Sequence, residues 1–413
     1  MTSFATTMAR FAQASHDWAD AVNAASGGHA PTAGGAASRL RPVRHFGSNP
    51  GGLEMLVYVP ARLAPRPALV VVLHGCGQDA AGYDAGAGWS DLADRHGFAL
   101  LYPQQTSSNN PKSCFNWFRS GDIARDRGEA LSIRQMVEAA TAAYGIARER
   151  VYVTGLSAGG AMTAVMLATY PDVFAGGAVI AGLPYGGARS VGEALDSMFK
   201  GRTHTADEWG DLVRAASSHE GPWPTVSIWH GSADATVKPT NATELVKQWT
   251  DVHGVGATTR RRSNVDGHLR EVWTDAAGRE VVESFTVAGM GHGTPLHVGT
   301  GADRAGAAGP FLLDVGISSS HHIAAFWGLT SWQAPAERSV APPSGRPLGG
   351  EARPLSGEAR PLQGEVLPPG SSDERAQAGP GGSILDGLAA KGVRPDVLRT
   401  IGRAFRAAGL TPS

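Results

Sequence analysis

The stretch VYVTGLSAGGAMTAVMLATYP, residues 151–171, places one serine between two glycines where one residue pattern gives way to another. The residues before it, Val151–Thr154, are β-branched or aromatic, which favours a strand. The residues from Ala158 onward are mostly small or apolar helix formers, which favours a helix. The serine, Ser157, therefore stands at a predicted strand-to-helix turn.

The pentapeptide GLSAG, Gly155–Gly159, matches the G-x-S-x-G pattern of a nucleophile elbow. Its two glycines leave room for neighbouring backbone, and the N-terminus of the following helix directs unpaired amides at the serine oxygen. The alternative is that Ser157 only caps a helix in a glycine-rich turn. Because the strand and the helix flank it in the required order, we interpret Ser157 as a nucleophile.

A serine nucleophile needs a base and an acid, which in this arrangement follow it in the order Asp or Glu, then His. Asp234 comes just after the strand-like run TVSIWHG, residues 225–231. It therefore falls at the carboxyl end of a strand, where the ligand-facing groups of open α/β sheets collect. The alternative for Asp234 is a turn residue that caps the helix after Pro239. We expect Asp234 to orient the base.

The base is expected later in the chain than Asp234. His292 lies in the glycine-rich segment AGMGHGTP, residues 288–295, after a strand-like run. This placement suits an imidazole that must reach both an acid and a serine. His297 is the reserve candidate. Histidines in less suitable positions are His230, His253, His268, His321 and His322.

The tetrahedral intermediate that a serine nucleophile forms needs two N–H donors for its oxyanion. One comes from the residue after the nucleophile, here Ala158, and the other from a loop after an earlier strand. We expect the second donor in LHGCGQ, residues 73–78, and favour the amide of Cys76 over its sulfur. His74 in the same run is expected to order the loop through hydrogen bonds.

Short β-rich runs alternate with helical stretches from about residue 44 onward. The alternation predicts an α/β fold with a mostly parallel central sheet covered by helices on both faces. The continuous apolar run Leu69–Leu73 predicts a central strand. Strands are expected at 53–60, 68–75, 98–104, 151–154, 177–181, 225–229 and 280–287. Helices are expected at 124–144, 158–169, 206–217, 239–252 and 319–327.

Length and composition indicate one large domain with attached segments. We expect an N-terminal arm at 1–43, an α/β catalytic domain at 44–333, a Pro/Gly-rich linker at 334–382 and a short helical tail at 383–413. The linker contains GEARPL twice, seven residues apart. Proline in this repeat excludes a coiled coil, because its ring blocks the helical hydrogen bond.

The 36 Lys and Arg residues nearly balance the 37 Asp and Glu residues, which argues against a nucleic-acid partner. The sequence has no run of about 18 apolar residues and no basic segment followed by an apolar one at its start, so we expect neither a membrane span nor a Sec signal. A cytoplasmic location is favoured, with an extracellular one as the alternative. The oligomeric state is left open.

Two other motif-based interpretations fail. The segment GLSAGG is not followed by Gly-Lys-Ser or Gly-Lys-Thr, so it is not a phosphate-binding loop. The two cysteines and the scattered histidines lack the ligand spacing of a zinc site. The sequence therefore implies no metal and no nucleotide cofactor.

Taken together, LHGCGQ, GLSAGGAM, HGSADATV and GMGHGTP, with NNPKSCFNWF at 109–118, resemble the polyhydroxybutyrate depolymerase and feruloyl esterase group of α/β-hydrolases. The resemblance is strongest to the short-chain polyhydroxyalkanoate depolymerase branch and spans roughly residues 40–330. It implies a triad of Ser157, Asp234 and His292, with the oxyanion hole formed by the amides already named.

The resemblance also implies a disulfide between Cys76 and Cys114, with free thiols as the alternative. In this chain Gly293–Leu296 follows the proposed catalytic histidine, where some secreted members carry a Trp-Pro pair. We expect Trp117 and Tyr185 to contact substrate, because ligand sites are mostly apolar with a few polar groups. The alternative for both aromatic residues is packing in the core.

The activity that the resemblance implies is hydrolysis of carboxylic esters in hydroxyalkanoate polyesters or oligomers, through an acyl-enzyme on the serine. The first alternative is a feruloyl or acetyl-xylan type esterase that acts on plant polysaccharide esters. The second is a non-catalytic α/β-hydrolase scaffold that acts by binding. Reaction of the serine with a fluorophosphonate separates the two enzymes from the scaffold.

Overall fold

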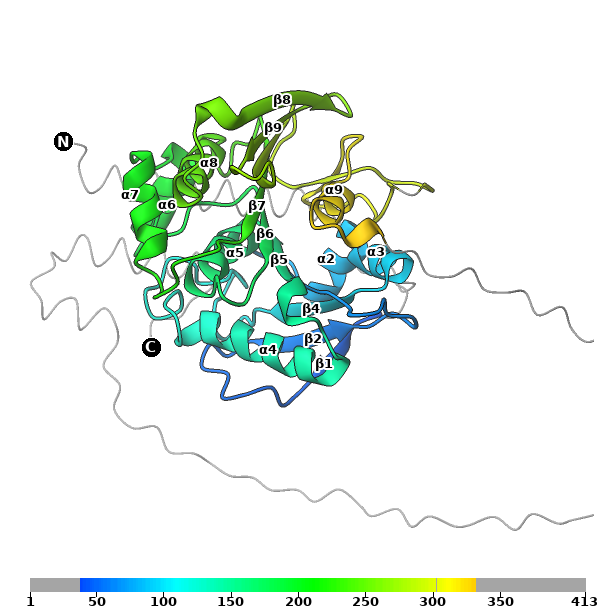
Figure 1. Ribbon diagram of the computed structural model, residues 1–413. Coiled ribbons are helices and arrows are strands. Elements are labelled where there is room, and N and C mark those ends of the chain that lie inside the picture. Colours follow the sequence, from blue (N-terminus) through cyan, green and yellow to red (C-terminus); the bar gives the residue numbers. More distant parts are fainter. Residues whose placement is uncertain (1–37, 302, 332–413) are drawn as a thin grey trace, which may run out of the picture. The chain divides into compact units, whose positions relative to one another are not determined.

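The computed structural model of the protein describes residues 38–301 and 303–331 (Figure 1). The expected linker and almost all of the expected arm lie outside the described residues, and so does the expected helical tail. Within the described ranges, a ten-stranded sheet has the order β1-β2-β4-β3-β5-β6-β7-β10-β9-β8, and a second sheet pairs β11 with β12.

The elements follow one another along the chain as strands and helices in alternation. The strands are β1 Arg41–Val43, β2 Glu54–Tyr58, β3 Leu69–Leu73, β4 Ala99–Gln104, β5 Val151–Leu156, β6 Gly176–Ile180, β7 Thr225–Gly231, β8 Arg260–Val265, β9 His268–Thr274, β10 Glu280–Val287, β11 Thr294–Leu296 and β12 Leu312–Asp314. The helices are α2 Ala80–Ala87, α3 Trp89–His96, α4 Gly128–Tyr144, α5 Ala158–Thr169, α6 Val191–Lys200, α7 Ala206–Arg214, α8 Thr240–Val252 and α9 Ser319–Phe326, with short 3-10 turns at Arg148–Arg150, Ala257–Thr259 and Leu329–Ser331.

The middle of the large sheet is parallel. Every neighbouring pair from β4 to β10 runs in parallel, whereas β1 and β2 at one edge and β8 and β9 at the other are antiparallel to their neighbours. The predicted mostly parallel sheet is therefore confirmed.

Strand β3 shows how the two faces of the sheet are filled. All five of its residues are buried. Leu69, Val71 and Leu73 pack into the core formed with α4, α5, α7 and α8. Val70 and Val72 pack on the opposite side with α2, α3 and α9. Because alternate side chains of a strand point to opposite faces, this central strand joins both halves of the core, as the sequence predicts.

Several elements are not predicted from the sequence. Strand β1 lies in the expected N-terminal arm and pairs with β2, Pro42 opposite Leu56, so the sheet begins before the expected boundary at residue 44. Strands β8 and β9 form a hairpin across Asp266 and Gly267, whose φ angles are 50° and 86°. The other additions are α2, α3, α6, β11 and β12.

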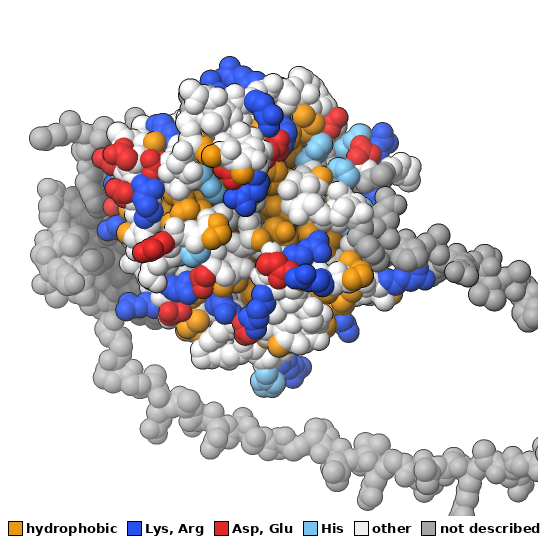
Figure 2. All heavy atoms as spheres, viewed as in Figure 1, with side chains coloured by type: hydrophobic (Ala, Val, Ile, Leu, Met, Phe, Trp, Pro, Cys, Tyr) orange, Lys and Arg blue, Asp and Glu red, His pale blue; other side chains and the backbone are white. Residues whose placement is uncertain are grey.

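Basic and acidic side chains are interspersed on the face shown in Figure 2. Ion pairs within the described residues include Arg148 with Glu138 at 2.6 Å and Arg262 with Glu271 at 2.8 Å. The near balance of charges in the composition is thus also a local balance on this surface. None of the helices in the described ranges is both long and apolar enough to cross a membrane.

Candidate active site

Ser157 stands between β5, which ends at Leu156, and α5, which begins at Ala158. Its backbone has a φ of 58° and a ψ of −115°, a conformation that costs a non-glycine residue free energy. The side chain makes no capping hydrogen bond to α5. Ser157 therefore occupies the N-cap position of α5, but its hydroxyl does not cap the helix.

The two glycines of the elbow are required by close backbone contacts. A Cβ atom on Gly155 would lie 2.5 Å from the carbonyl group of Gly159. A Cβ atom on Gly159 would lie 2.3 Å from the carbonyl oxygen of Leu73 in β3. Only glycine permits this approach of β3, β5 and α5, which places the serine beside the loop that follows β3.

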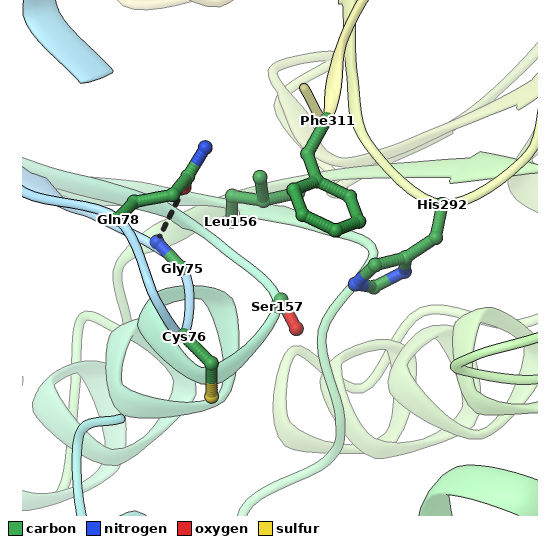
Figure 3. Close-up of a pocket in the computed structure, with 7 residues that line it drawn as sticks. All are labelled: Gly75, Cys76, Gln78, Leu156, Ser157, His292 and Phe311. Atoms are coloured by element: carbon green, nitrogen blue, oxygen red, sulfur yellow. Dashed lines mark hydrogen bonds between the residues drawn. The ribbon is translucent and has the colours of Figure 1, made fainter. Parts of the chain in front are cut away.

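Ser157 and His292 line one small pocket (Figure 3). The other lining residues are Gly75, Cys76, Gln78, Leu156 and Phe311. In Figure 3 the serine side chain lies between Cys76 and the imidazole of His292. The elbow, the loop after β3 and the loop after β10 thus meet at this pocket.

The imidazole of His292 is held by a buried carboxylate. Its Nδ1 atom lies 2.7 Å from Oδ2 of Asp234, and the two side chains are 9% and 0% exposed. A carboxylate only accepts hydrogen bonds, so Nδ1 carries the proton and Nε2 is left with a lone pair. This is the tautomer that a general base for serine requires.

The second oxygen of Asp234 stabilises the turn after β7. Oδ1 accepts hydrogen bonds from the amides of Thr236 and Val237, both at 2.9 Å. Helix α8 begins only at Thr240, with Pro239 before it and no side-chain cap. Asp234 is therefore a turn residue and also the partner of His292, but it does not cap α8.

A second histidine lies against the same carboxylate. His230 is buried, its Nε2 donates to the carbonyl of Val237 at 2.8 Å, and the same atom lies 3.4 Å from Oδ2 of Asp234. Burial alone would raise the pKa of Asp234, but hydrogen bonds and charge from His230 and His292 outweigh burial and hold this pKa well below its usual value. Asp234 is therefore ionised at neutral pH.

Two amides close to Ser157 are candidates for an oxyanion hole. Ala158 is the first residue of α5, and amides of the first helical turn have no partner within the helix. In the loop after β3, the amide of Gly77 donates to the carbonyl of Lys112 at 2.8 Å. The amide of Cys76 has no protein acceptor among the described residues. Cys76 lines the pocket of Ser157, and Ala158 directly follows Ser157 in the chain; their role as the oxyanion hole stays a prediction.

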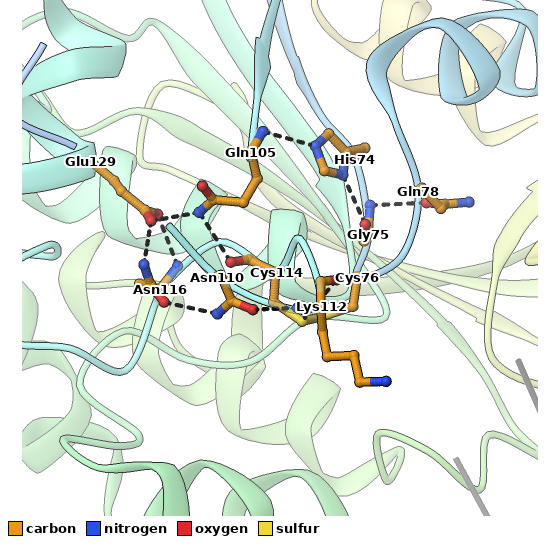
Figure 4. Close-up of a disulfide and its surroundings, with 10 residues drawn as sticks. All are labelled: His74, Gly75, Cys76, Gln78, Gln105, Asn110, Lys112, Cys114, Asn116 and Glu129. Carbon is orange, nitrogen blue, oxygen red and sulfur yellow. Dashed lines mark hydrogen bonds between the residues drawn. A yellow bond between two sulfur atoms is a disulfide. The ribbon is translucent and has the colours of Figure 1, made fainter. Parts of the chain in front are cut away.

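Hydrogen bonds of the His74 side chain hold the loop that contains Cys76. His74 is buried, its Nδ1 bonds to the carbonyl of Gly75 at 2.8 Å, and its Nε2 accepts from the amide of Gln105 at 3.2 Å. Burial lowers the pKa of His74, so the ring is neutral. The expectation that His74 orders this loop is confirmed. A disulfide also joins Cys76 to Cys114, 38 residues along the chain (Figure 4).

The residues predicted to contact substrate lie elsewhere. Trp117 is 6% exposed and belongs to the core, and Tyr185 is half-buried against that core. Neither lines the pocket of Ser157. Their contact with substrate stays a prediction.

Phe311 is the aromatic residue that the sequence analysis misses. It lines the pocket, and its ring centroid lies 6.0 Å from that of His292 in an edge-to-face arrangement. Phe311 precedes β12, whose pairing with β11 brings it back to the catalytic loop. Phe311 has a φ of 61°, and its position depends on strand pairing between distant residues. Neither feature produces a local sequence pattern that would predict its place in the pocket.

The other histidine candidates take part in structural contacts outside the pocket. His297 pairs with Asp303 at 3.2 Å. His253 and His268 bond to the backbone carbonyls of Pro224 and Val315, and His322 pairs with Asp266. Across the described ranges, no group of three or more His, Cys, Asp or Glu residues is arranged to hold a metal ion.

These features define an α/β-hydrolase of the serine carboxylic-ester hydrolase class. The family model described as esterase PHB depolymerase matches residues 53–272, more than half of the chain. The chain therefore belongs to the esterase PHB depolymerase family, as the resemblance of its motifs implies.

Individual relatives agree with this assignment. Poly(3-hydroxyalkanoate) depolymerase C of Paucimonas lemoignei is 51% identical over 70% of this chain and 70% of its own length. Feruloyl esterase B of Talaromyces stipitatus is 34% identical over 66% of this chain and 77% of its own length. Acetylxylan esterase of Coprinopsis cinerea is 38% identical over 63% of this chain and 70% of its own length.

A solved structure supports the same fold. The structure of acetyl xylan esterase from Aspergillus awamori aligns with a TM-score of 0.59 and 27% sequence identity. The alignment covers 70% of this chain and 99% of that enzyme. The α/β-hydrolase fold predicted from the sequence is confirmed.

Proposed function

We propose that the protein hydrolyses the ester bonds of hydroxyalkanoate polyesters or oligomers, with Ser157 as nucleophile, His292 as base and Asp234 as its orienting acid. The observation that carries the proposal is the pocket in which Ser157 and the Asp234-bound His292 meet beside the amide of Cys76. The 51% identity to a poly(3-hydroxyalkanoate) depolymerase supports the substrate class.

The geometry supports a two-step reaction. His292 Nε2 takes the proton of the Ser157 hydroxyl as its oxygen attacks the ester carbonyl, and the amides of Cys76 and Ala158 stabilise the oxyanion. Collapse of the intermediate breaks the ester bond, and His292 gives its proton to the leaving alkoxide. Water, deprotonated by His292, then attacks the acyl-enzyme and releases a carboxylic acid and the free serine.

A second candidate is a feruloyl or acetyl-xylan type esterase. The 34% identity to feruloyl esterase B and the 38% identity to an acetylxylan esterase favour it. The same triad and the same pair of amides serve this activity, because only the acyl and alcohol parts of the ester differ. The discriminating residues are therefore those of the substrate wall rather than those of the triad.

A substrate panel on the purified full chain tests both candidates. We expect higher kcat/KM for trimers of 3-hydroxybutyrate than for methyl ferulate or acetylated xylan. The reverse order would favour the second candidate. The Ser157→Ala variant serves as the control and is expected to lose both hydrolysis and labelling by a fluorophosphonate. A wild-type protein that neither labels nor cleaves any ester would leave only the binding scaffold.

A further inference from the structure

A glutamate is fully buried behind the loop that carries Cys76. Glu129, in the first turn of α4, is 0% exposed. A buried carboxylate is costly unless hydrogen bonds replace its lost hydration. The helix N-terminus offsets part of that cost. The mechanism proposed above gives Glu129 no role, so its presence needs another explanation.

Four N–H groups converge on this carboxylate. Oε1 accepts from the side-chain amides of Gln105 at 2.6 Å, Asn116 at 2.7 Å and Asn109 at 3.1 Å. Oε2 accepts from the backbone amide of Asn116 at 2.8 Å. All four donors belong to residues 105–116, which follow β4, so one carboxylate holds this stretch of the segment between β4 and α4 together; Figure 4 shows the bonds from Gln105 and Asn116.

The gathered segment is tied to the loop after β3 at three points. The amide of Gln105 donates to His74, whose other nitrogen bonds to the carbonyl of Gly75. The carbonyl of Lys112 accepts from the amide of Gly77 at 2.8 Å. The third tie is the disulfide between Cys76 and Cys114. Within the segment, the Gln105 side chain donates to the carbonyl of Cys114 at 3.1 Å.

We propose that Glu129 is a positioning residue for the oxyanion hole: through Gln105 and Asn116 it fixes the segment that holds the Cys76 amide in place. The inference rests on the proposed function, in which this amide stabilises the oxyanion. Gly77, directly after Cys76, donates to Lys112 of the segment, and Gly75, directly before it, is linked to Gln105 of the segment through the His74 ring, so a shift of the segment moves the Cys76 amide.

The charge on Glu129 matters as well as its shape. All four partners are donors, so both carboxylate oxygens must accept. In a Glu129→Gln variant, an NH2 group would replace one oxygen and oppose at least one of these donors. The segment would have to move to relieve that contact. Burial, as the largest effect, raises the pKa of Glu129 to about 7 against the lowering by these hydrogen bonds. The variants are therefore compared well above pH 7, where the carboxyl group of wild type is charged and both of its oxygens accept.

The test compares Glu129→Gln with wild type and with Glu138→Gln, a control on the same helix whose exposed carboxylate pairs with Arg134 and Arg148. Active protein is counted by the final extent of fluorophosphonate labelling. Above pH 7, kinetics with p-nitrophenyl acetate are expected to show kcat lowered about 10- to 100-fold with KM within about 2-fold, because ångström-scale misplacement costs on the order of 100-fold. The control is expected to match wild type.

A second measurement separates positioning from a merely structural role. Trifluoroacetone adds to the catalytic serine and places an oxyanion in the hole, so its inhibition constant should rise by about the same factor as kcat falls. A folded Glu129→Gln protein with wild-type kcat, or with lowered kcat and unchanged affinity for trifluoroacetone, overturns the inference.

Should Glu129→Gln fail to fold, Asn109→Ala decides. It removes the longest of the four bonds to Glu129, together with the bonds of the same side chain to the carbonyl of Gly51 at 2.9 Å and to Oε1 of Gln105 at 2.8 Å. We expect kcat and trifluoroacetone affinity to fall together by at least about 2-fold, the value of one hydrogen bond. Wild-type values for this variant overturn the inference. Failure of the proposed function is distinct, because wild type itself would then neither label nor hydrolyse the ester.

Discussion

At the scale of single residues, Asp234 shows how one side chain serves both the fold and the chemistry. One of its oxygens closes the turn after β7, and the other holds His292. The turn preference of aspartate and its expected catalytic role were alternatives in the sequence, but the structure combines them. Substitutions that spare one oxygen can therefore separate the two contributions.

Replacing Asp234 by asparagine keeps an oxygen that accepts from Thr236 and Val237 but presents an NH2 group to His292. The histidine then favours the tautomer with its proton on Nε2, which cannot accept from the serine. We expect a folded protein with kcat lowered by roughly 10³- to 10⁴-fold on a soluble ester. Turnover within 10-fold of wild type would contradict the assignment.

The low pKa of Asp234 also predicts how stability depends on pH. A carboxylate whose pKa is lower in the folded than in the unfolded protein stabilises the fold above the unfolded value of about 4. This contribution is lost as the pH falls through the folded value. We expect the free energy of unfolding of wild type to fall more steeply in acid than that of Asp234→Asn, by urea titration. The control Asp196→Asn, at an exposed residue that pairs with Lys200, should follow wild type.

Phe311 gives a prediction about the substrate wall. Its side chain lines the pocket, and its ring lies edge-to-face with the His292 ring. We expect Phe311→Ala to lower kcat/KM for p-nitrophenyl butyrate about 5- to 30-fold, since burying part of an apolar side chain contributes about 1–2 kcal/mol. The loss for the acetate ester should be smaller. Phe326→Ala, at a half-buried phenylalanine outside this pocket, is the control, and equal losses in both variants would refute the role.

The sequence predicts the reactive part of the candidate site better than its walls. Short glycine-containing motifs contain Ser157, His292 and Cys76. The glycines in these motifs are required by the local backbone conformation, so adjacent residues in the sequence identify the three positions. Phe311 reaches the pocket only through the pairing of β11 with β12, and three-residue strands leave almost no pattern. Trp117 was predicted from its aromatic character alone, and its position in the core depends on the fold of the whole segment.

At the scale of elements, the crossing of β3, β5 and α5 determines where the site forms. Apolar runs and helix-forming stretches predict these three elements because both faces of the parallel strands are buried. The β8–β9 hairpin is missed because the residues of β8, RRRSNV, are mostly exposed and polar. Its Asp-Gly turn is a recognised hairpin signal, and the two positive φ angles there match it.

The crossing predicts a strong effect of Gly159→Ala. The added methyl carbon would lie 2.3 Å from the carbonyl oxygen of Leu73 and 2.6 Å from that of His74. Backbone on both sides must shift, so we expect a loss of at least about 2–3 kcal/mol in the free energy of unfolding. Urea denaturation measures it. Gly192→Ala in α6, where a Cβ meets nothing within 4 Å, should be neutral or stabilising; similar values for both variants would contradict the close contact.

At the scale of the whole molecule, described residues form the core clusters on both sides of the large sheet. The late helix α9 and the residues after it return to the first half of the chain, where Trp327 stacks on Tyr152 at 4.8 Å and on Trp89 at 6.2 Å between ring centroids. At the other end, β1 extends the sheet and Arg39 pairs with Asp91 and Asp94. The catalytic unit expected from the sequence therefore needs a start a few residues earlier.

A chain limited to residues 38–331 is expected to carry the complete esterase. All residues of the candidate site and of both core clusters lie in it, so we expect cooperative thermal unfolding and a kcat/KM within about 2-fold of the full chain on p-nitrophenyl acetate, because every residue placed at the reacting atoms is kept. A chain that begins at residue 45 loses β1 and the Arg39 ion pairs and should unfold at a lower temperature.

If residues 332–413 contribute to binding of a polymer surface, the 38–331 chain will lose activity on polyester particles while it keeps activity on the soluble ester. Loss of activity on both substrates in a folded 38–331 chain would show instead that the catalytic unit extends beyond these residues.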